Sequence, residues 1–172
     1  MKAAVCEDEE ALQLFLEKQV CECMEEAGIN GSCEVFSSAE ELLEKGNPFY
    51  DLYLLDIQLG QMTGMELAEK IREKDDHAVI LFATNYKEMI RKAFQVSALD
   101  YLVKPLDEVE VRQALLRSFR YLSKKRNRIA LKNQSGVFEQ NKRNNSESRK
   151  YSKLHTKKFA VSNLSEYGYC VF

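Results

Sequence analysis

Short apolar runs alternate with longer amphipathic segments from residue 1 to about residue 120, and this alternation sharply narrows the folds open to the chain. Each run has the length of a β-strand, and several are almost continuously apolar, as in strands buried on both faces of a sheet. Five strands alternating with five helices predict an α/β fold, in which right-handed crossovers give a parallel sheet with helices on both faces. The five runs start at Ala3, Cys33, Leu52, Val79 and Tyr101.

The amphipathic segments carry apolar residues at the three- and four-residue spacing of a helix. Ser38, with Glu41 three residues later, predicts a capping box at the start of the second helix. Gly28 and Gly46 stand where helices should end. The predicted helical faces consist of Leu12, Leu16, Val20, Cys23 and Ala27, then Leu67, Ala68 and Ile71, then Met89, Ile90, Ala93 and Phe94, and finally Val111, Ala114, Leu115, Ser118, Phe119 and Leu122.

Charge is divided unevenly along the chain. Residues 124–172 contain 12 basic and 3 acidic side chains, whereas the preceding residues contain 13 basic and 24 acidic ones. This split predicts an acidic folded part followed by a basic tail. No stretch approaches the roughly 18 consecutive apolar residues of a membrane span, and the acids at Glu7 and Asp8 come too early for a signal peptide. We therefore expect a cytoplasmic protein with no membrane segment.

Charged and hydroxyl side chains follow the ends of four predicted strands. Glu7 and Asp8 follow the first strand, Asp56 the third, Thr84 the fourth and Lys104 the fifth. In open parallel sheets, ligands bind beyond the carboxyl ends of the strands, so these side chains should converge. At about 4 Å, each pair of carboxylates repels by about 4 kcal/mol at an effective dielectric constant of about 20.

A cation should therefore compensate these carboxylates. The cluster offers only oxygen ligands, and Mg²⁺ fits such a site best. A carboxylate beside Mg²⁺, an ammonium group and a hydroxyl group can accept a phosphoryl group. In that reaction Asp56 would attack, while Lys104 and the metal neutralise charge on the transferred oxygens.

Residues 1 to about 122 resemble the receiver domain of bacterial two-component response regulators. Residues 93–105 are especially similar to regulators that carry a LytTR-type DNA-binding domain. The resemblance implies a flavodoxin-like, doubly wound sheet with strand order 2-1-3-4-5. The matching residues are Glu7, Asp8, the run 51–57, Gly64, Thr84, Lys104 and Pro105.

The resemblance also implies roles around the metal. Asp56 would be the phosphoacceptor. Asp8, Asp56 and the backbone carbonyl of Gln58 would bind Mg²⁺, and Glu7 would act mainly through a metal-bound water. Lys104 would pair with the acyl phosphate.

A conformational switch is implied as well. Thr84 would move toward the phosphoryl group, and Tyr101 would turn inward into the space vacated, which reshapes the surface of the fourth helix and fifth strand. The Lys104–Pro105 peptide bond would be cis. Output would run through the surface formed by residues 87–101.

The implied partner is a sensor histidine kinase, and full-length relatives control transcription. A phosphorylation-dependent homodimer is left open. The chain would catalyse only its own phosphorylation and dephosphorylation. Three departures from the family pattern stand out: Gly60 replaces a frequent proline, Asn85 replaces a very small residue, and Gln58 and Tyr86 occupy positions that tune dephosphorylation.

The chain after the receiver is short. We expect residues 1–122 to form the receiver, residues 123–138 to be a linker and the start of a LytTR-type domain, and residues 139–172 to be a basic, poorly ordered tail. Only 44 residues follow Arg128, fewer than the roughly 100 of a compact domain. We therefore expect a truncated output domain that does not bind DNA sequence-specifically.

Other functions fit the same architecture. The chain could be a standalone receiver that competes for its kinase. A flavin-binding electron carrier is disfavoured because no glycine-rich phosphate loop follows the first strand. A phosphatase with an aspartyl-phosphate intermediate is disfavoured because Gln58 stands where that enzyme needs a second acid.

Overall fold

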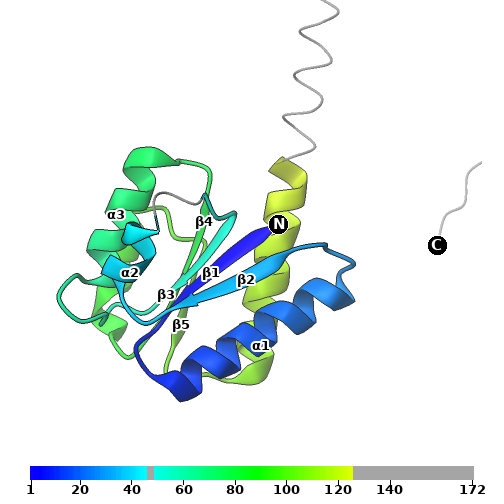
Figure 1. Ribbon diagram of the computed structural model, residues 1–172, viewed down its shortest axis with the longest axis horizontal. Helices are drawn as coiled ribbons and strands as arrows, with labels where there is room; N and C mark the ends of the chain where they lie inside the picture. Colours follow the sequence, from blue (N-terminus) through cyan, green and yellow to red (C-terminus); the bar gives the residue numbers. More distant parts are fainter. Residues whose placement is uncertain (46–48, 126–172) are drawn as a thin grey trace, which may run out of the picture. The chain divides into compact units, whose positions relative to one another are not determined.

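A five-stranded parallel sheet forms the centre of the computed structural model, which describes residues 1–45 and 49–125. The strand order is β2-β1-β3-β4-β5, and every neighbouring pair is parallel. Both the predicted sheet and its order are therefore confirmed (Figure 1). The strands are β1 (Lys2–Cys6), β2 (Ser32–Phe36), β3 (Leu52–Leu55), β4 (Val79–Thr84) and β5 (Asp100–Val103).

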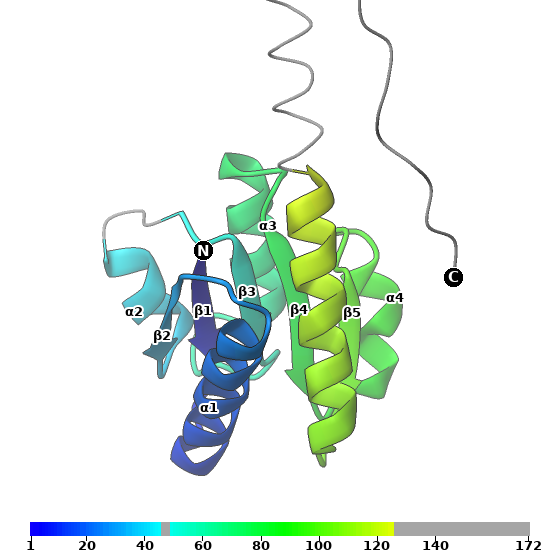
Figure 2. The same cartoon turned by 90° about the vertical axis from the view of Figure 1, so that its right-hand side faces the viewer.

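Helices cover both faces of this sheet, as predicted. In Figure 2, α1 and the final helix lie on one face, and α2, α3 and α4 lie on the other. The helices are α1 (Glu10–Glu26), α2 (Ala39–Glu44), α3 (Gly64–Lys74), α4 (Ile90–Ala93), which follows a 3₁₀ turn η1 (Lys87–Met89), and a final helix at residues 108–125.

Two apolar cores, one on each face, explain why the strands read as continuous apolar runs. Successive side chains of a strand point to opposite faces. Ala3 and Val5 accordingly pack with α1 and the final helix, whereas Ala4 and Cys6 pack with α2 and α3. At roughly 25 cal/mol per Å² of apolar surface buried, these two cores supply most of the driving force for folding.

The helix boundaries agree with the sequence in most places. Gly28 ends α1 with a positive φ of 63°. Ser38 caps α2 as expected, but the carboxylate of Glu41 accepts hydrogen bonds from the amide and hydroxyl of Ser37, so the reciprocal bond of a capping box is not made. A complete capping box occurs instead at α3, between Thr63 and Glu66.

Helix α4 is shorter than the sequence predicts. Its apolar pattern included Phe94, which is 73% exposed and lies beyond the end of the helix. No side chain caps the start of η1 or of α4, which helps to explain why only one α-helical turn forms. In the final helix, by contrast, all six residues of the predicted apolar face are buried.

Some predictions fall outside the described residues. These are the helix end at Gly46, most of the linker and LytTR-like segment at residues 123–138, and the tail at residues 139–172. The final helix continues through residue 125, past the predicted end of the receiver. Within the described part of the chain, the helices are all too short or too polar to cross a bilayer.

Candidate phosphoacceptor site

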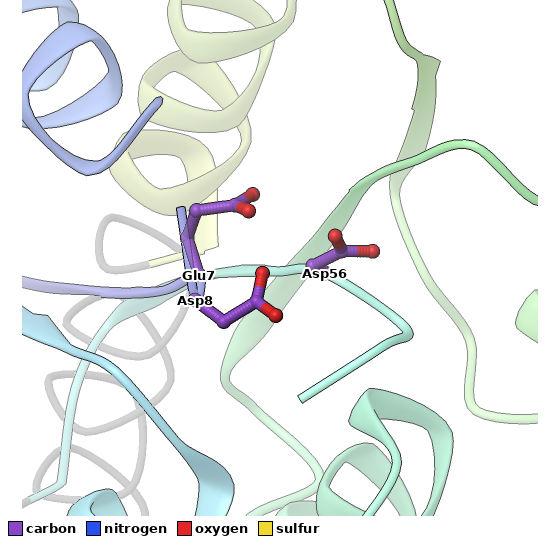
Figure 3. A group of neighbouring side chains, drawn as sticks. All are labelled: Glu7, Asp8 and Asp56. Atoms are coloured by element: carbon purple, nitrogen blue, oxygen red, sulfur yellow. The ribbon is translucent and has the colours of Figure 1, made fainter. Parts of the chain in front are cut away.

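Three carboxylates gather at the carboxyl edge of the sheet, as the sequence predicts. Glu7 and Asp8 directly follow β1, and Asp56 directly follows β3, the neighbour of β1 in the sheet. Figure 3 shows their side chains extending from these two strand ends. One oxygen of each carboxylate lies within 4.8 Å of the others, and Glu7 and Asp56 are buried while Asp8 is exposed. The cluster therefore has one side open to solvent.

Lys104 reaches into the cluster from the end of β5. Its Nζ donates to Asp56 Oδ2 at 2.6 Å and to Glu7 Oε1 at 2.8 Å. Burial lowers the pKa of Lys104, but the hydrogen bonds and charges of Asp56 and Glu7 outweigh burial and raise its pKa overall. The ammonium group therefore stays charged near neutral pH. The Lys104–Pro105 bond is cis, as expected.

Glu7 is the most buried acid of the three. Burial raises the pKa of its carboxyl group, although the hydrogen bond and charge of Lys104 oppose the shift. Oε2 lies 2.8 Å from Lys104 Nζ but has no hydrogen bond of its own within the described residues. The ammonium group of Lys104, which lies 2.8 Å from each oxygen of this buried carboxylate, therefore compensates its charge.

The carboxylate of Asp56 is fixed at both oxygens. Oδ1 accepts hydrogen bonds from the amides of Ile57 at 2.5 Å and Gln58 at 3.2 Å, while Oδ2 contacts Lys104. The backbone is held as well, because the Asp56 amide donates to the Cys6 carbonyl at 2.9 Å. The Asp56 carboxylate is therefore held in one orientation before any ligand binds.

Gly64 holds the loop after Asp56 against the start of α3. Its amide donates to the Ile57 carbonyl at 2.8 Å. A Cβ atom at Gly64 would lie 1.8 Å from the backbone oxygen of Asp56. The close approach of the two backbones therefore requires glycine at this position.

Gln13 contributes to the site although the sequence gives little sign of it. From the first turns of α1, its Nε2 donates to the Glu7 carbonyl at 2.6 Å and holds the loop that carries Glu7 and Asp8. A glutamine in an amphipathic helix normally indicates only an exposed polar face. Its contact depends on how the loop folds back, which periodicity does not reveal.

Thr84 lies at the end of β4 and is completely buried. Its backbone oxygen accepts a hydrogen bond from the Lys104 amide at 2.9 Å, which places the two residues side by side. Within the described residues its hydroxyl has no hydrogen-bond partner and makes no bond to the carboxylates. Thr84 therefore carries a buried hydroxyl without a hydrogen-bond partner beside the residue that bonds to Asp56.

Tyr101 connects this edge to the region before α4. Its hydroxyl donates to the backbone oxygen of Tyr86, and its ring lies 5.9 Å from that of Phe82. Burial, followed by the charges of Glu88 and Asp56, raises the pKa of Tyr101 to about 12, so the hydroxyl remains a donor.

The two positions expected to tune dephosphorylation contact each other. Tyr86 donates through its hydroxyl to Gln58 Oε1 at 2.9 Å. The backbone amide of Gln58 in turn donates a hydrogen bond to Asp56 Oδ1. These bonds link the loop after Asp56 to the segment before η1. The metal-binding role of the Gln58 carbonyl stays a prediction.

The sequence is similar to those of proteins from one known family. Residues 3–116 match the response regulator receiver domain family. The chain is 35% identical over 132 residues to the sensory transduction protein LytT of Bacillus anthracis, which covers 77% of this chain and 51% of that protein. It is 40% identical over 77 residues to LytR of Staphylococcus haemolyticus, covering 44% and 30% respectively. The chain spans about half the length of LytT.

Solved structures agree with the sequence match. The response regulatory domain of mrkE from Klebsiella pneumoniae is 25% identical, with a TM-score of 0.64, and the alignment covers 72% of this chain and 99% of that one. A CheY-like receiver domain from Methanospirillum hungatei, 24% identical with a TM-score of 0.60 over 72% and 97% of the two chains, shows the same fold. Both comparisons and the family match lead to one assignment: the chain belongs to the response regulator receiver family, and residues 3–116 are the receiver domain of a two-component response regulator.

Proposed function

We propose that the chain accepts a phosphoryl group on Asp56 with the help of Mg²⁺ and changes the surface at residues 87–101 in response. The observation that carries the proposal is the position of Lys104, whose ammonium group lies between the buried carboxylates of Glu7 and Asp56. A structural ion pair needs one acid for each base. Here two buried acids share the same cation, and one oxygen of a third acid, Asp8, lies within 4.8 Å of theirs at a solvent-accessible edge.

In the proposed reaction, a carboxylate oxygen of Asp56 attacks phosphorus in a phosphohistidine of a sensor kinase. The new O–P bond forms as the N–P bond breaks, and the electron pair of that bond leaves with the imidazole. Lys104 stabilises negative charge on the transferred oxygens. The buried hydroxyl of Thr84 then has a phosphoryl oxygen to bond.

The residues present fit Mg²⁺ by their chemistry. Glu7, Asp8 and Asp56 supply oxygen ligands only, and one oxygen of each lies within 4.8 Å of the others. Asp8, Asp56 and the Gln58 carbonyl would hold the ion, with Glu7 acting through a water molecule. When bound, Mg²⁺ would neutralise the acid cluster and the charge of a phosphoryl group.

Mg²⁺ is expected to stabilise the protein through this cluster. At a concentration about 100 times its Kd, a ligand of the native state adds about 2.7 kcal/mol, so the Tm in Mg²⁺ should exceed that in EDTA by several degrees. Asp8→Asn should abolish the difference between the two melting curves, while Glu10→Gln, which alters a nearby exposed acid, should preserve it. If Mg²⁺ raised the Tm of Asp8→Asn as much as that of the wild type, the ion would bind elsewhere.

Beryllofluoride with Mg²⁺ mimics the phosphorylated state and tests the switch. In the wild-type protein it should change amide hydrogen exchange in residues 87–101, because these contain η1, α4 and Tyr101. Asp56→Asn should remove the response, and Asp76→Asn, at an exposed acid outside the site, should retain it. Identical responses in wild type and Asp56→Asn would refute the proposed role of Asp56.

The organisation of the longer protein is also proposed. Residues 1–122 would be the receiver, residues 123–138 a linker and the start of a LytTR-type domain, and residues 139–172 a basic tail. A sensor histidine kinase would be the partner, and transcriptional control would belong to full-length relatives. The names of the LytT and LytR relatives, which describe sensory transduction proteins, support the signalling role.

A further inference from the structure

Helix α4 is weakly anchored by its own residues. It is a single turn, its N-terminus is uncapped, and Ala93 is its one buried residue. A helix of this length is not stable on its own, because nucleation outweighs the few hydrogen bonds it gains. The position of α4 must therefore depend on contacts made at its two ends.

The turn from α4 to β5 is unusual in its backbone. Ser97 has a φ of 51°, and no other non-glycine residue in the described chain has a positive φ. The turn makes one local bond, from the Ala98 amide to the Ala93 carbonyl at 3.0 Å, and one bond to β4, from the Leu99 amide to the Ile80 carbonyl at 2.8 Å. A serine in this conformation costs roughly 1–2 kcal/mol, so surrounding contacts must hold it.

Arg72 provides such contacts from the last turn of α3. Its rigid guanidinium group can donate five hydrogen bonds in a fixed plane. Here it joins the turn after α4 to the loop after α3, and each of its nitrogens takes part. Nε donates to the Val96 carbonyl at 2.7 Å, Nη1 to the carbonyls of Ala78 at 2.8 Å and Asp75 at 3.1 Å, and Nη2 to the Ser97 carbonyl at 3.4 Å.

We propose that Arg72 is a clamp that fixes the α4–β5 turn to the end of α3 and limits the mobility of α4. Arg72 bonds to residues that follow α4 in the chain, whereas the Tyr101 hydroxyl bonds to Tyr86, which precedes α4. Movement of the α4 surface must then break the Arg72 bonds or carry the end of α3 along. The clamp is read from contacts alone, whereas its bearing on signalling rests on the proposed function.

Hydrogen exchange of the full chain tests the clamp. Arg72→Met keeps the length of the side chain and removes all four bonds. Exchange of the amides in residues 93–99 should become faster on the order of tenfold, while that of β1 and α1 stays unchanged. In Arg72→Lys, the exchange rate of residues 93–99 should lie between those of the wild type and Arg72→Met, because an ammonium group can restore only some of the four guanidinium hydrogen bonds. Lys70→Met, which removes an exposed cation from the same helix, should match the wild type.

Two results would overturn the clamp. One is wild-type exchange in residues 93–99 of Arg72→Met. The other is faster exchange throughout the chain in both Arg72→Met and Arg72→Lys, which would make Arg72 a general stability residue. Beryllofluoride separates the clamp from the proposed function. If wild type does not respond to it while Arg72→Met still exchanges faster only in residues 93–99, the clamp stands and the proposed function fails.

Discussion

Replacing Lys104 with methionine should slow phosphorylation by acetyl phosphate by about 100-fold or more. The expected loss follows from the proposed role of Lys104 as a donor to the transferred oxygens, since removing one such donor typically costs two to three orders of magnitude. The measurement is the initial rate of phosphoryl incorporation in Mg²⁺. Lys70→Met, at an exposed position on α3, is the matched control and should react at the wild-type rate.

The same substitution should also destabilise the protein. Removing one partner of a buried ion pair leaves an uncompensated charge and costs about 3–5 kcal/mol, and here both Glu7 and Asp56 lose their cation. Urea unfolding in EDTA should show this loss, and Mg²⁺ should restore part of it by supplying another positive charge. Wild-type rate and stability together would show that Lys104 is not needed at the site.

Replacing Gly64 with alanine should be among the most damaging single-methyl changes in the chain. The added Cβ would lie 1.8 Å from the Asp56 carbonyl oxygen and 2.8 Å from its carbon, and both are backbone atoms that no side-chain rotation can move. We expect a loss of at least about 3 kcal/mol of unfolding free energy, or a failure to fold. Phosphorylation should fall as well, because the Asp56 loop must shift.

Gly60→Ala separates steric collision from backbone strain. Gly60 has a φ of 84°, but a Cβ there would meet nothing within 4 Å. Only the strain of a left-handed conformation remains, at about 1–2 kcal/mol. Gly60→Ala should therefore unfold at a higher urea concentration than Gly64→Ala. The reverse order would contradict the close approach of α3 to the Asp56 loop.

The fold was largely predictable because its signals are redundant along the chain. A run such as residues 52–55 is apolar at every position, since both faces of a central strand are buried. The alternation with helical segments then leaves few topologies. Helix α4 was the exception. Its apolar spacing predicted a longer helix, but missing caps and the Ser97 turn shorten it, and Phe94 is left exposed.

The acid cluster was predictable for a geometric reason. Parallel strands end at one edge, so residues that follow β1, β3 and β5 must meet there regardless of their separation in sequence. Contacts made by side chains that fold back were not predictable. Gln13 and Arg72 bind backbone carbonyls of loops, and no periodicity or motif marks a residue that recognises a backbone oxygen.

The close packing at Gly64 was likewise not predictable from the local sequence. The sequence offered the glycine only through family resemblance, and the reason for it becomes visible when the Cβ position is compared with Asp56. Loop-to-loop distances of this kind are set by the whole packing of α3 against β3. They follow from the fold and are not written in the local sequence.

Mapping of the phosphorylated residue tests the central claim most directly. After reaction with acetyl phosphate in Mg²⁺, borohydride reduction and peptide mass spectrometry should locate one phosphoryl group on Asp56. Incorporation should be absent in EDTA and in Asp56→Asn. A phosphoryl group on another residue, or equal incorporation into Asp56→Asn, would contradict the account.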